Sequence, residues 1–188
     1  MNDIKLNLGC GEKRFPGYLN VDKFGTPDLK HDLESFPWPW EANSVSEIAL
    51  IHVLEHLGKE TEVYFGIFKE MYRVCKHGSK IQIIVPHFRH QFFYDDPTHV
   101  RVVTPLSLKL FSKKLNQKWV KEGKSNSTLG LYLNIDFELK KTLVKPSQDW
   151  FRLHPEQNVD LKLLQQESSI YNNLIEQYDM TLEVIKDN

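Results

Sequence analysis

Two glycines and two aspartates near the beginning of the sequence stand where short apolar runs end. Gly9 and Gly11 follow the first run, and Asp22 and Asp32 close the second and the third. In an open α/β sheet the ligand binds beyond the carboxyl ends of the strands, and glycines in the first turn let the backbone approach it. A carboxylate after the second strand can accept both ribose hydroxyls, and one after the third can reach an adenine edge. The pattern therefore indicates a nucleotide site; the alternative is a tight turn with loop-capping aspartates.

A second group of reactive side chains follows the apolar run that ends at Pro86. Within fourteen residues the chain carries His87, His90, Asp95, Asp96 and His99. An imidazole titrates near neutral pH and can serve as a general base, and His87 and His99 are the best placed to do so. The alternative is structural, with Asp95 or Asp96 forming an Asx-type turn and the histidines satisfying backbone groups.

The stretch HVLEH, from His52 to His56, matches the pattern H-x-x-E-H. In that pattern two histidines one helical turn apart bind zinc and the glutamate activates water. It needs a helix through His52, but the apolar run before it is typical of a buried strand. A zinc hydrolase is therefore the least favoured alternative. No cysteine or paired carboxylate supports a metal cluster around His87–His99 either, so we expect no metal site.

Length and composition limit the class of protein. The 188 residues fit one domain over 1–188, and 24 Lys and Arg against 25 Asp and Glu give no bulk positive charge for nucleic acid. The two cysteines are typical of a reducing compartment. No signal-peptide pattern and no apolar run near 18 residues is present. We expect a cytoplasmic protein without a membrane span.

Alternating strands and helices would position these side chains. Strands are expected at Ile4–Leu8, Tyr18–Asp22, Leu29–Asp32, Ser46–His52, Lys80–Val85, Asn134–Val144 and Met180–Lys186. Helices are expected at Glu60–Lys76, from Thr104 and Pro105 onward, and at Asp160–Gln177. This order predicts a doubly wound, mostly parallel α/β sheet, with Ser46–His52 buried on both faces. Only EKRFPG separates Gly11 from the second strand, so the first crossover helix should be shortened or missing.

Several spaced motifs resemble the class I S-adenosylmethionine-dependent methyltransferases, in particular the small methyltransferase-type-11-like group. They are LNLGCG, GYLNVD, HDLESFPW, SVSEIALIHVLEHL and GSKIQIIVP, and the resemblance covers Lys5 to about Phe111. It implies a Rossmann-like seven-stranded sheet with an antiparallel last strand and S-adenosylmethionine as cofactor. It also implies cofactor contacts for the backbone of Gly9, Cys10 and Gly11 at the methionine moiety, Asp22 at the ribose, Asp32 and Leu33 at the adenine, and His52 near the sulfonium.

The sequence departs from this family in three places. Asn7 stands where the family usually has an acid facing the cofactor ammonium, so Asn7→Asp would be expected to tighten cofactor binding. Lys13 replaces the third family glycine. The three residues before the first strand cannot form the helix that often covers the active site in the family. We therefore expect an open pocket, or one that a second copy of the chain closes in a homodimer.

The resemblance implies transfer of the sulfonium methyl group to an oxygen, nitrogen or carbon nucleophile, chiefly by positioning the reactants. With no inserted domain and near-neutral charge, we expect a small-molecule or sugar acceptor. The main alternative is a binding or scaffold protein that keeps the fold without catalysis. The loop His87–Val103 is expected to act as a lid. An aromatic wall for the acceptor, or ordinary core packing, accounts for Trp38, Trp40, Phe88, Phe92, Phe93 and Tyr94.

Overall fold

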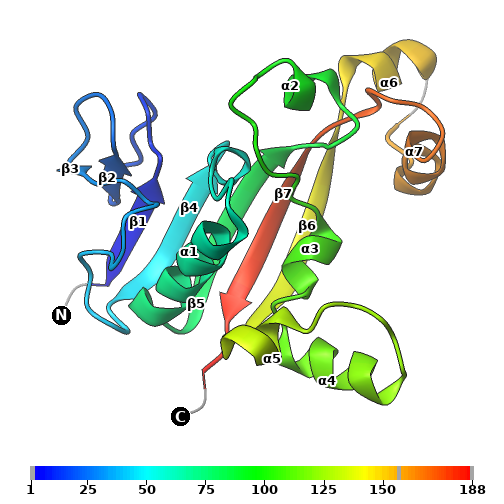
Figure 1. Ribbon diagram of the computed structural model, residues 1–188. Helices are drawn as coiled ribbons and strands as arrows, with labels where there is room; N and C mark the ends of the chain where they lie inside the picture. Colours follow the sequence, from blue (N-terminus) through cyan, green and yellow to red (C-terminus); the bar gives the residue numbers. More distant parts are fainter. Residues whose placement is uncertain (1–2, 156–157, 187–188) are drawn as a thin grey trace.

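The computed structural model describes residues 3–155 and 158–186, and the strands in these ranges form one sheet (Figure 1). The strand order is β3-β2-β1-β4-β5-β7-β6. The strands are β1 Ile4–Leu8, β2 Leu19–Asp22, β3 Leu29–Lys30, β4 Val45–Ile51, β5 Cys75–Pro86, β6 Phe137–Pro146 and β7 Ile175–Val184. Neighbours from β3 to β5 run parallel, whereas β7 is antiparallel to both β5 and β6. The predicted Rossmann-like seven-stranded sheet with an antiparallel last strand is confirmed.

The helices follow the caps and periodicity of the sequence in most places. They are η1 Leu54–His56, α1 Thr61–Val74, α2 Gln91–Tyr94, α3 Pro105–Lys109, α4 Lys113–Lys121, α5 Leu129–Leu133, α6 Gln148–Leu153 and α7 Leu161–Ser168. At α3, Thr104 is the N-cap and Pro105 begins the helix, as predicted, and Thr104 also forms a capping box with Ser107. None of the helices in the described ranges is long and apolar enough to cross a bilayer.

The prediction of one helix over Asp160–Gln177 is wrong in its second half. Helix α7 ends at Ser168, and the chain enters β7 at Ile175. Asn173 adopts a left-handed conformation with φ of 64° in the turn between them. The apolar residues of this turn, Leu174 and Ile175, pack with Trp150 and Leu164 in a small satellite core. Tertiary packing therefore overrides the helical periodicity here.

One face of the sheet is apolar and the other is polar. Buried side chains on the face that packs against α1 include Leu6, Leu8, Ile48, Leu50, Ile81, Ile83, Met180 and Leu182. The alternate positions carry charged and amide groups: Lys5 pairs with Glu47 at 2.8 Å, and Gln82 donates to Asp179 at 3.1 Å. Among the described elements, no helix is drawn behind this second face (Figure 1). The expectation that Ser46–His52 is buried on both faces is therefore wrong at Glu47, whose side chain keeps 35% of its exposure.

The β1–β2 connection runs from Gly9 to Tyr18 without a helix, which confirms the missing first crossover helix. The amide of Asn7 anchors this connection to the sheet, because its Nδ2 donates to the carbonyl of Lys13 at 2.8 Å and to Oδ1 of Asn20 at 2.9 Å. The same Asn20 oxygen accepts from the backbone N–H of Phe15 at 2.9 Å. Two buried amides thus hold the short crossover against the sheet.

Candidate functional site

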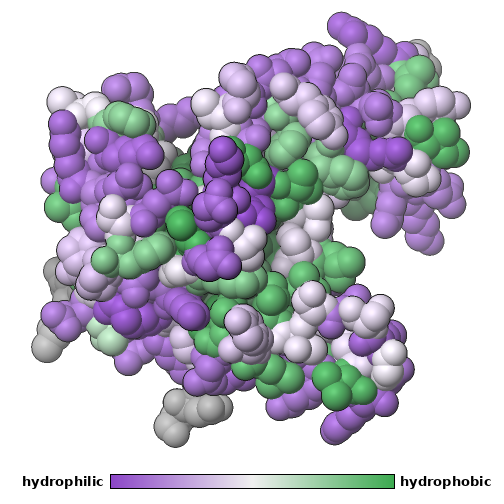
Figure 2. Space-filling view, viewed as in Figure 1, coloured by the Kyte–Doolittle hydropathy of each residue, from purple (hydrophilic) through white to green (hydrophobic). Residues whose placement is uncertain are grey.

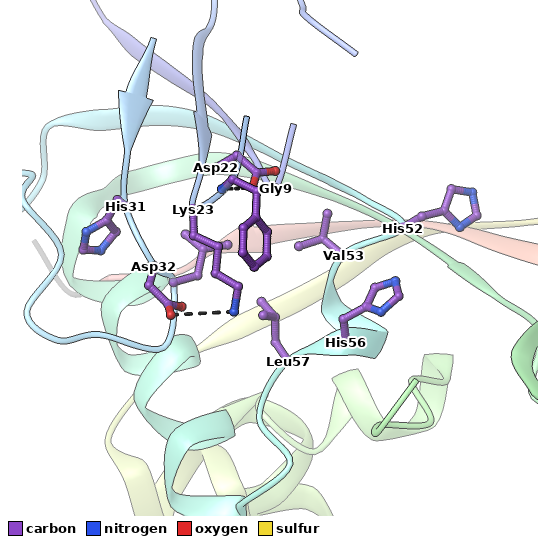
Figure 3. A pocket seen from close by; sticks show the side chains of 11 residues that line it. Gly9, Asp22, Lys23, His31, Asp32, His52, Val53, His56 and Leu57 are labelled. Carbon is purple, nitrogen blue, oxygen red and sulfur yellow. Dashed lines mark hydrogen bonds and ion pairs between the residues drawn. The ribbon is translucent and has the colours of Figure 1, made fainter. Parts of the chain in front are cut away.

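A cavity of about 230 Å³ lies beyond the carboxyl ends of β1, β2 and β4 (Figure 3). It is lined by Gly9, Asp22, Lys23, Phe24, His31, Asp32, Leu33, His52, Val53, His56 and Leu57. This is the edge at which an open α/β sheet binds its ligands. Five of the residues predicted from sequence line it together, namely Gly9, Asp22, Asp32, Leu33 and His52.

Gly9 is required at the first strand end for two reasons. Its φ of +66° lies in the left-handed region, which L side chains rarely adopt. A Cβ at this position would lie 2.6 Å from both methyl carbons of Val53, which lines the same cavity. The turn therefore brings backbone against the cavity wall with no room for a side chain.

The carboxylate of Asp22 is held in place by backbone donors. Its Oδ2 accepts from the N–H of Gly11 and its Oδ1 from the N–H of Phe24, both at 2.9 Å. Each oxygen of an ionised carboxylate has about two acceptor sites, so both keep capacity for a further donor. The group is therefore oriented at the cavity and able to accept two hydroxyls.

The segment that follows β3 contributes a second carboxylate to the cavity. Asp32 accepts from the N–H of Glu34 at 3.0 Å through Oδ1, and its Oδ2 lies 3.7 Å from Nζ of Lys23 (Figure 3). This ion pair is partly exposed, so its contribution to stability is small. Phe24, which also lines the cavity, is 72% exposed, and Nζ of Lys23 lies over its ring at 5.3 Å from the centroid.

A second cavity, of about 360 Å³, adjoins the first. It is lined by His52, Glu55, His56, Pro86, Phe92, Asp96, His99, Glu176 and Gln177. His52 and His56 line both cavities. His52 has a φ of 57° at the end of β4, and its Nδ1 lies 3.4 Å from Oε1 of Glu55. A ligand in one cavity can therefore come close to a ligand in the other at these two histidines.

The zinc-hydrolase interpretation of HVLEH is wrong in its structural premise. His52 follows β4, and only Leu54–His56 forms a short 3-10 helix. The two histidines consequently do not lie one turn apart on an α-helix, which is what H-x-x-E-H requires.

Three predicted cofactor residues are absent from the lining of the first cavity: Asn7, Cys10 and Gly11. Asn7 and Cys10 are buried, and burial raises the pKa of the Cys10 thiol. The backbone N–H of Gly11 donates a hydrogen bond to the Asp22 carboxylate. Their direct contact with a cofactor stays a prediction.

Asn7→Asp should destabilise the protein rather than tighten cofactor binding. Asn7 is 2% exposed, and its Nδ2 faces two acceptors, the Lys13 carbonyl and Asn20 Oδ1. A carboxylate there loses two hydrogen bonds and places a buried charge against oxygen atoms, at a cost of about 3 kcal/mol. Urea unfolding of both proteins measures this. Unchanged stability with stronger cofactor binding would instead restore the sequence-based expectation.

The structure does not bring His87 to this site. His87 is 4% exposed and borders a separate cavity of about 440 Å³ with residues of α3, β6, α7 and β7. Figure 2 shows hydrophobic side chains along the notch between the α6–α7 lobe and α3–α5. Burial lowers the pKa of His87 to about 4, and its Nδ1 accepts from the N–H of Arg89. We therefore retain only His99 as a candidate from this pair.

The segment 87–103 is anchored at both ends. Arg89 donates to the carbonyl of Ser168 at 2.7 Å, and the N–H groups of Val100 and Arg101 donate to the carbonyl of Glu55 at 2.9 and 3.0 Å. Helix α2 lies between these anchors, with His90 accepting from the N–H of Phe92 as its cap. Closure of this segment over a ligand stays a prediction.

Of the aromatic residues proposed for a wall, Phe92 lines the second cavity, whereas Trp38 and Trp40 belong to the main core.

Sequence reasoning indicated no cofactor role for six residues that line the first cavity: Lys23, Phe24, His31, Val53, His56 and Leu57. Lys23 and His31 directly follow β2 and β3, and Val53 follows His52, whereas Phe24, His56 and Leu57 lie further along the same connections. Their position at the carboxyl edge was the available signal.

Solved structures share this architecture over nearly the whole chain. A SAM-dependent methyltransferase from Archaeoglobus fulgidus has a TM-score of 0.64 and 18% identity, covering 96% of this chain and 86% of that one. The 1,6-didemethyltoxoflavin-N1-methyltransferase of Burkholderia thailandensis has a TM-score of 0.53 and 11% identity, over 97% and 71% of the two chains. A SAM-dependent methyltransferase from Methanosarcina mazei has a TM-score of 0.52 and 13% identity, over 99% and 94%.

No protein-family model and no curated protein sequence matches this chain. The structural matches confirm the resemblance at the level of the fold, which is that of the SAM-dependent methyltransferases.

Proposed function

We propose that the protein is a methyltransferase that transfers the methyl group of S-adenosylmethionine to a small polar acceptor. The observation that carries this proposal is the junction of two cavities at His52 and His56. One cavity lies at the carboxyl edge of the sheet, where open α/β sheets bind ligands, and the other is lined by polar and aromatic side chains. Methyl transfer by in-line displacement needs donor and acceptor held close and aligned, and two adjoining pockets provide that arrangement.

The first cavity suits the nucleoside part of the cofactor. Asp22 offers two oriented carboxylate oxygens for the ribose hydroxyls. Asp32 and Leu33, which follow β3, would flank the adenine, and the backbone of the turn at Gly9 would face the methionine moiety. His52 would then lie near the sulfonium, between cofactor and acceptor.

The second cavity supports a small acceptor. Its volume of about 360 Å³ is within the range of small-molecule pockets. Its lining includes the carboxylates Glu55, Asp96 and Glu176, which favour hydroxyl- or amine-bearing compounds over phosphate-rich nucleic acid.

A transfer assay tests this function. The protein is incubated with methyl-labelled S-adenosylmethionine and a metabolite extract, and label and S-adenosylhomocysteine are followed by mass spectrometry. We expect label in a low-molecular-weight product, in proportion to the S-adenosylhomocysteine released. Cofactor binding without any transfer would support the scaffold alternative, and label only in nucleic acid or protein would refute the small acceptor.

A further inference from the structure

Glu55 is a buried carboxylate whose oxygens have no hydrogen-bond donor among the residues that the structure describes. The residue is 1% exposed, and neither Oε1 nor Oε2 accepts a hydrogen bond from any residue within the described ranges. The nearest basic group is Nδ1 of His52, which lies 3.4 Å from Oε1. An ionised carboxylate without donors is costly inside a protein, so its presence calls for a compensating positive charge.

Two imidazoles complete a ligand set around this carboxylate. One side-chain ligand atom from each of Glu55, His56 and His99 lies within 4.8 Å of the other two. The rings of His56 and His99 have centroids 4.5 Å apart. Ligand atoms around one tetrahedral ion are separated by about 3.4 Å, so modest side-chain rotations would close the set.

Hydrogen bonds leave the Nε2 atoms of both histidines able to bind a metal. Nδ1 of His99 lies 2.8 Å from the carbonyl oxygen of Phe93, which only accepts, so Nδ1 carries the proton and Nε2 keeps its lone pair. Nδ1 of His56 lies 2.8 Å from Oγ1 of Thr98, whose own proton is donated to Asp96 at 2.6 Å. His56 is therefore also the donor at Nδ1. Such outer hydrogen bonds are typical of metal-binding histidines.

We infer that Glu55, His56 and His99 bind a divalent transition-metal ion at the wall of the second cavity, with Thr98 and Asp96 orienting His56. Two imidazole nitrogens and one carboxylate oxygen match Zn²⁺, Mn²⁺ or Co²⁺ better than Ca²⁺. Three protein ligands leave at least one position for water or an acceptor oxygen. On the proposed function, the ion would hold an acceptor hydroxyl beside His52 and lower its pKa. This inference replaces the expectation that the chain has no metal site.

Calorimetric titration of the full chain with Zn²⁺, Mn²⁺ and Co²⁺ separately, without S-adenosylmethionine, tests the site. We expect one ion of at least one metal per chain, and about 100-fold or weaker binding in Glu55→Gln and His99→Ala. Thr98→Val keeps all three ligands but loses the orienting hydrogen bond, so its affinity should fall roughly 10- to 100-fold. The matched control is His154→Ala, which removes a histidine that pairs with Glu167 at 2.8 Å away from both cavities.

Thermal unfolding provides a second measurement that does not depend on activity. Glu55→Gln removes a buried charge, so without metal it should be at least as stable as the natural sequence, and added metal should no longer raise its Tm. If none of the three metals binds, or if Glu55→Gln and His99→Ala bind as tightly as the control, the inference is wrong. Because cofactor binding is measured separately, that failure would leave the proposed methyltransferase function intact.

Discussion

Gly9→Ala should destabilise the protein by about 2 to 4 kcal/mol and weaken S-adenosylmethionine binding by roughly 10- to 100-fold. The left-handed φ of +66° disfavours alanine, and its Cβ would lie 2.6 Å from the methyl carbons of Val53. Either the first turn or Val53 must then shift, and both Gly9 and Val53 line the cavity. Urea unfolding and calorimetry of cofactor binding measure the two effects.

Gly11→Ala is the matched control for this prediction. Gly11 also has a positive φ, of +49°, but among the described residues beyond its two chain neighbours no atom lies within 4 Å of the Cβ that alanine would add. Only the conformational cost of about 1 to 2 kcal/mol is expected, with a smaller loss of cofactor affinity. Equal losses of affinity in both variants would show that backbone strain, and not the contact with Val53, is responsible.

Asp22→Ala should weaken S-adenosylmethionine binding roughly 10- to 150-fold. A charge-assisted pair of hydrogen bonds to the ribose hydroxyls is worth about 1.5 to 3 kcal/mol. The substitution also leaves the backbone N–H groups of Gly11 and Phe24 without the carboxylate acceptor that they bind in the natural sequence. Calorimetric titration measures the change in Kd.

Asp28→Asn provides the comparison for Asp22. Asp28 also accepts from backbone, at the N–H of Asn20, and pairs with Arg14 at 2.7 Å, but it does not line the cavity. Its replacement should leave cofactor affinity within about twofold. If Asp22→Ala binds as tightly as Asp28→Asn, Asp22 has no part in the cofactor site.

The fold was predictable because its signals are local. The apolar runs before Gly9, at Asp22 and at Pro86 each become parallel strands, and the short EKRFPG segment correctly predicts a missing crossover helix. The antiparallel last strand came from the family resemblance rather than from periodicity. The end of α7 could not be predicted, because it depends on packing of Leu174 and Ile175 against Trp150.

The candidate site was predictable only in part. Residues at strand ends, such as Gly9, Asp22 and His52, are brought together by the topology of a parallel sheet. Their positions after successive predicted strands are therefore enough to predict that they share one site. The family resemblance places Asn7 near the cofactor ammonium. In the structure its amide instead binds the Lys13 carbonyl and Asn20 in the short β1–β2 connection, and no sequence motif indicates these contacts.

The grouping of Glu55 and His56 with His99 was beyond sequence reasoning. His99 lies on the segment after β5. It comes close to Glu55 and His56 because the N–H groups of Val100 and Arg101 donate to the Glu55 carbonyl. Such a contact between distant segments depends on the path of a loop, which periodicity and caps do not determine.

The cavity at Gly9, Asp22 and Asp32 is the proposed binding site for S-adenosylmethionine. Calorimetric titration of the full chain with the cofactor tests it most directly, with S-adenosylhomocysteine as a competitor. We expect saturable binding of one cofactor per chain, displaced by S-adenosylhomocysteine and weakened at least about tenfold in Asp22→Ala. The absence of saturable binding by a protein shown to be folded would contradict it.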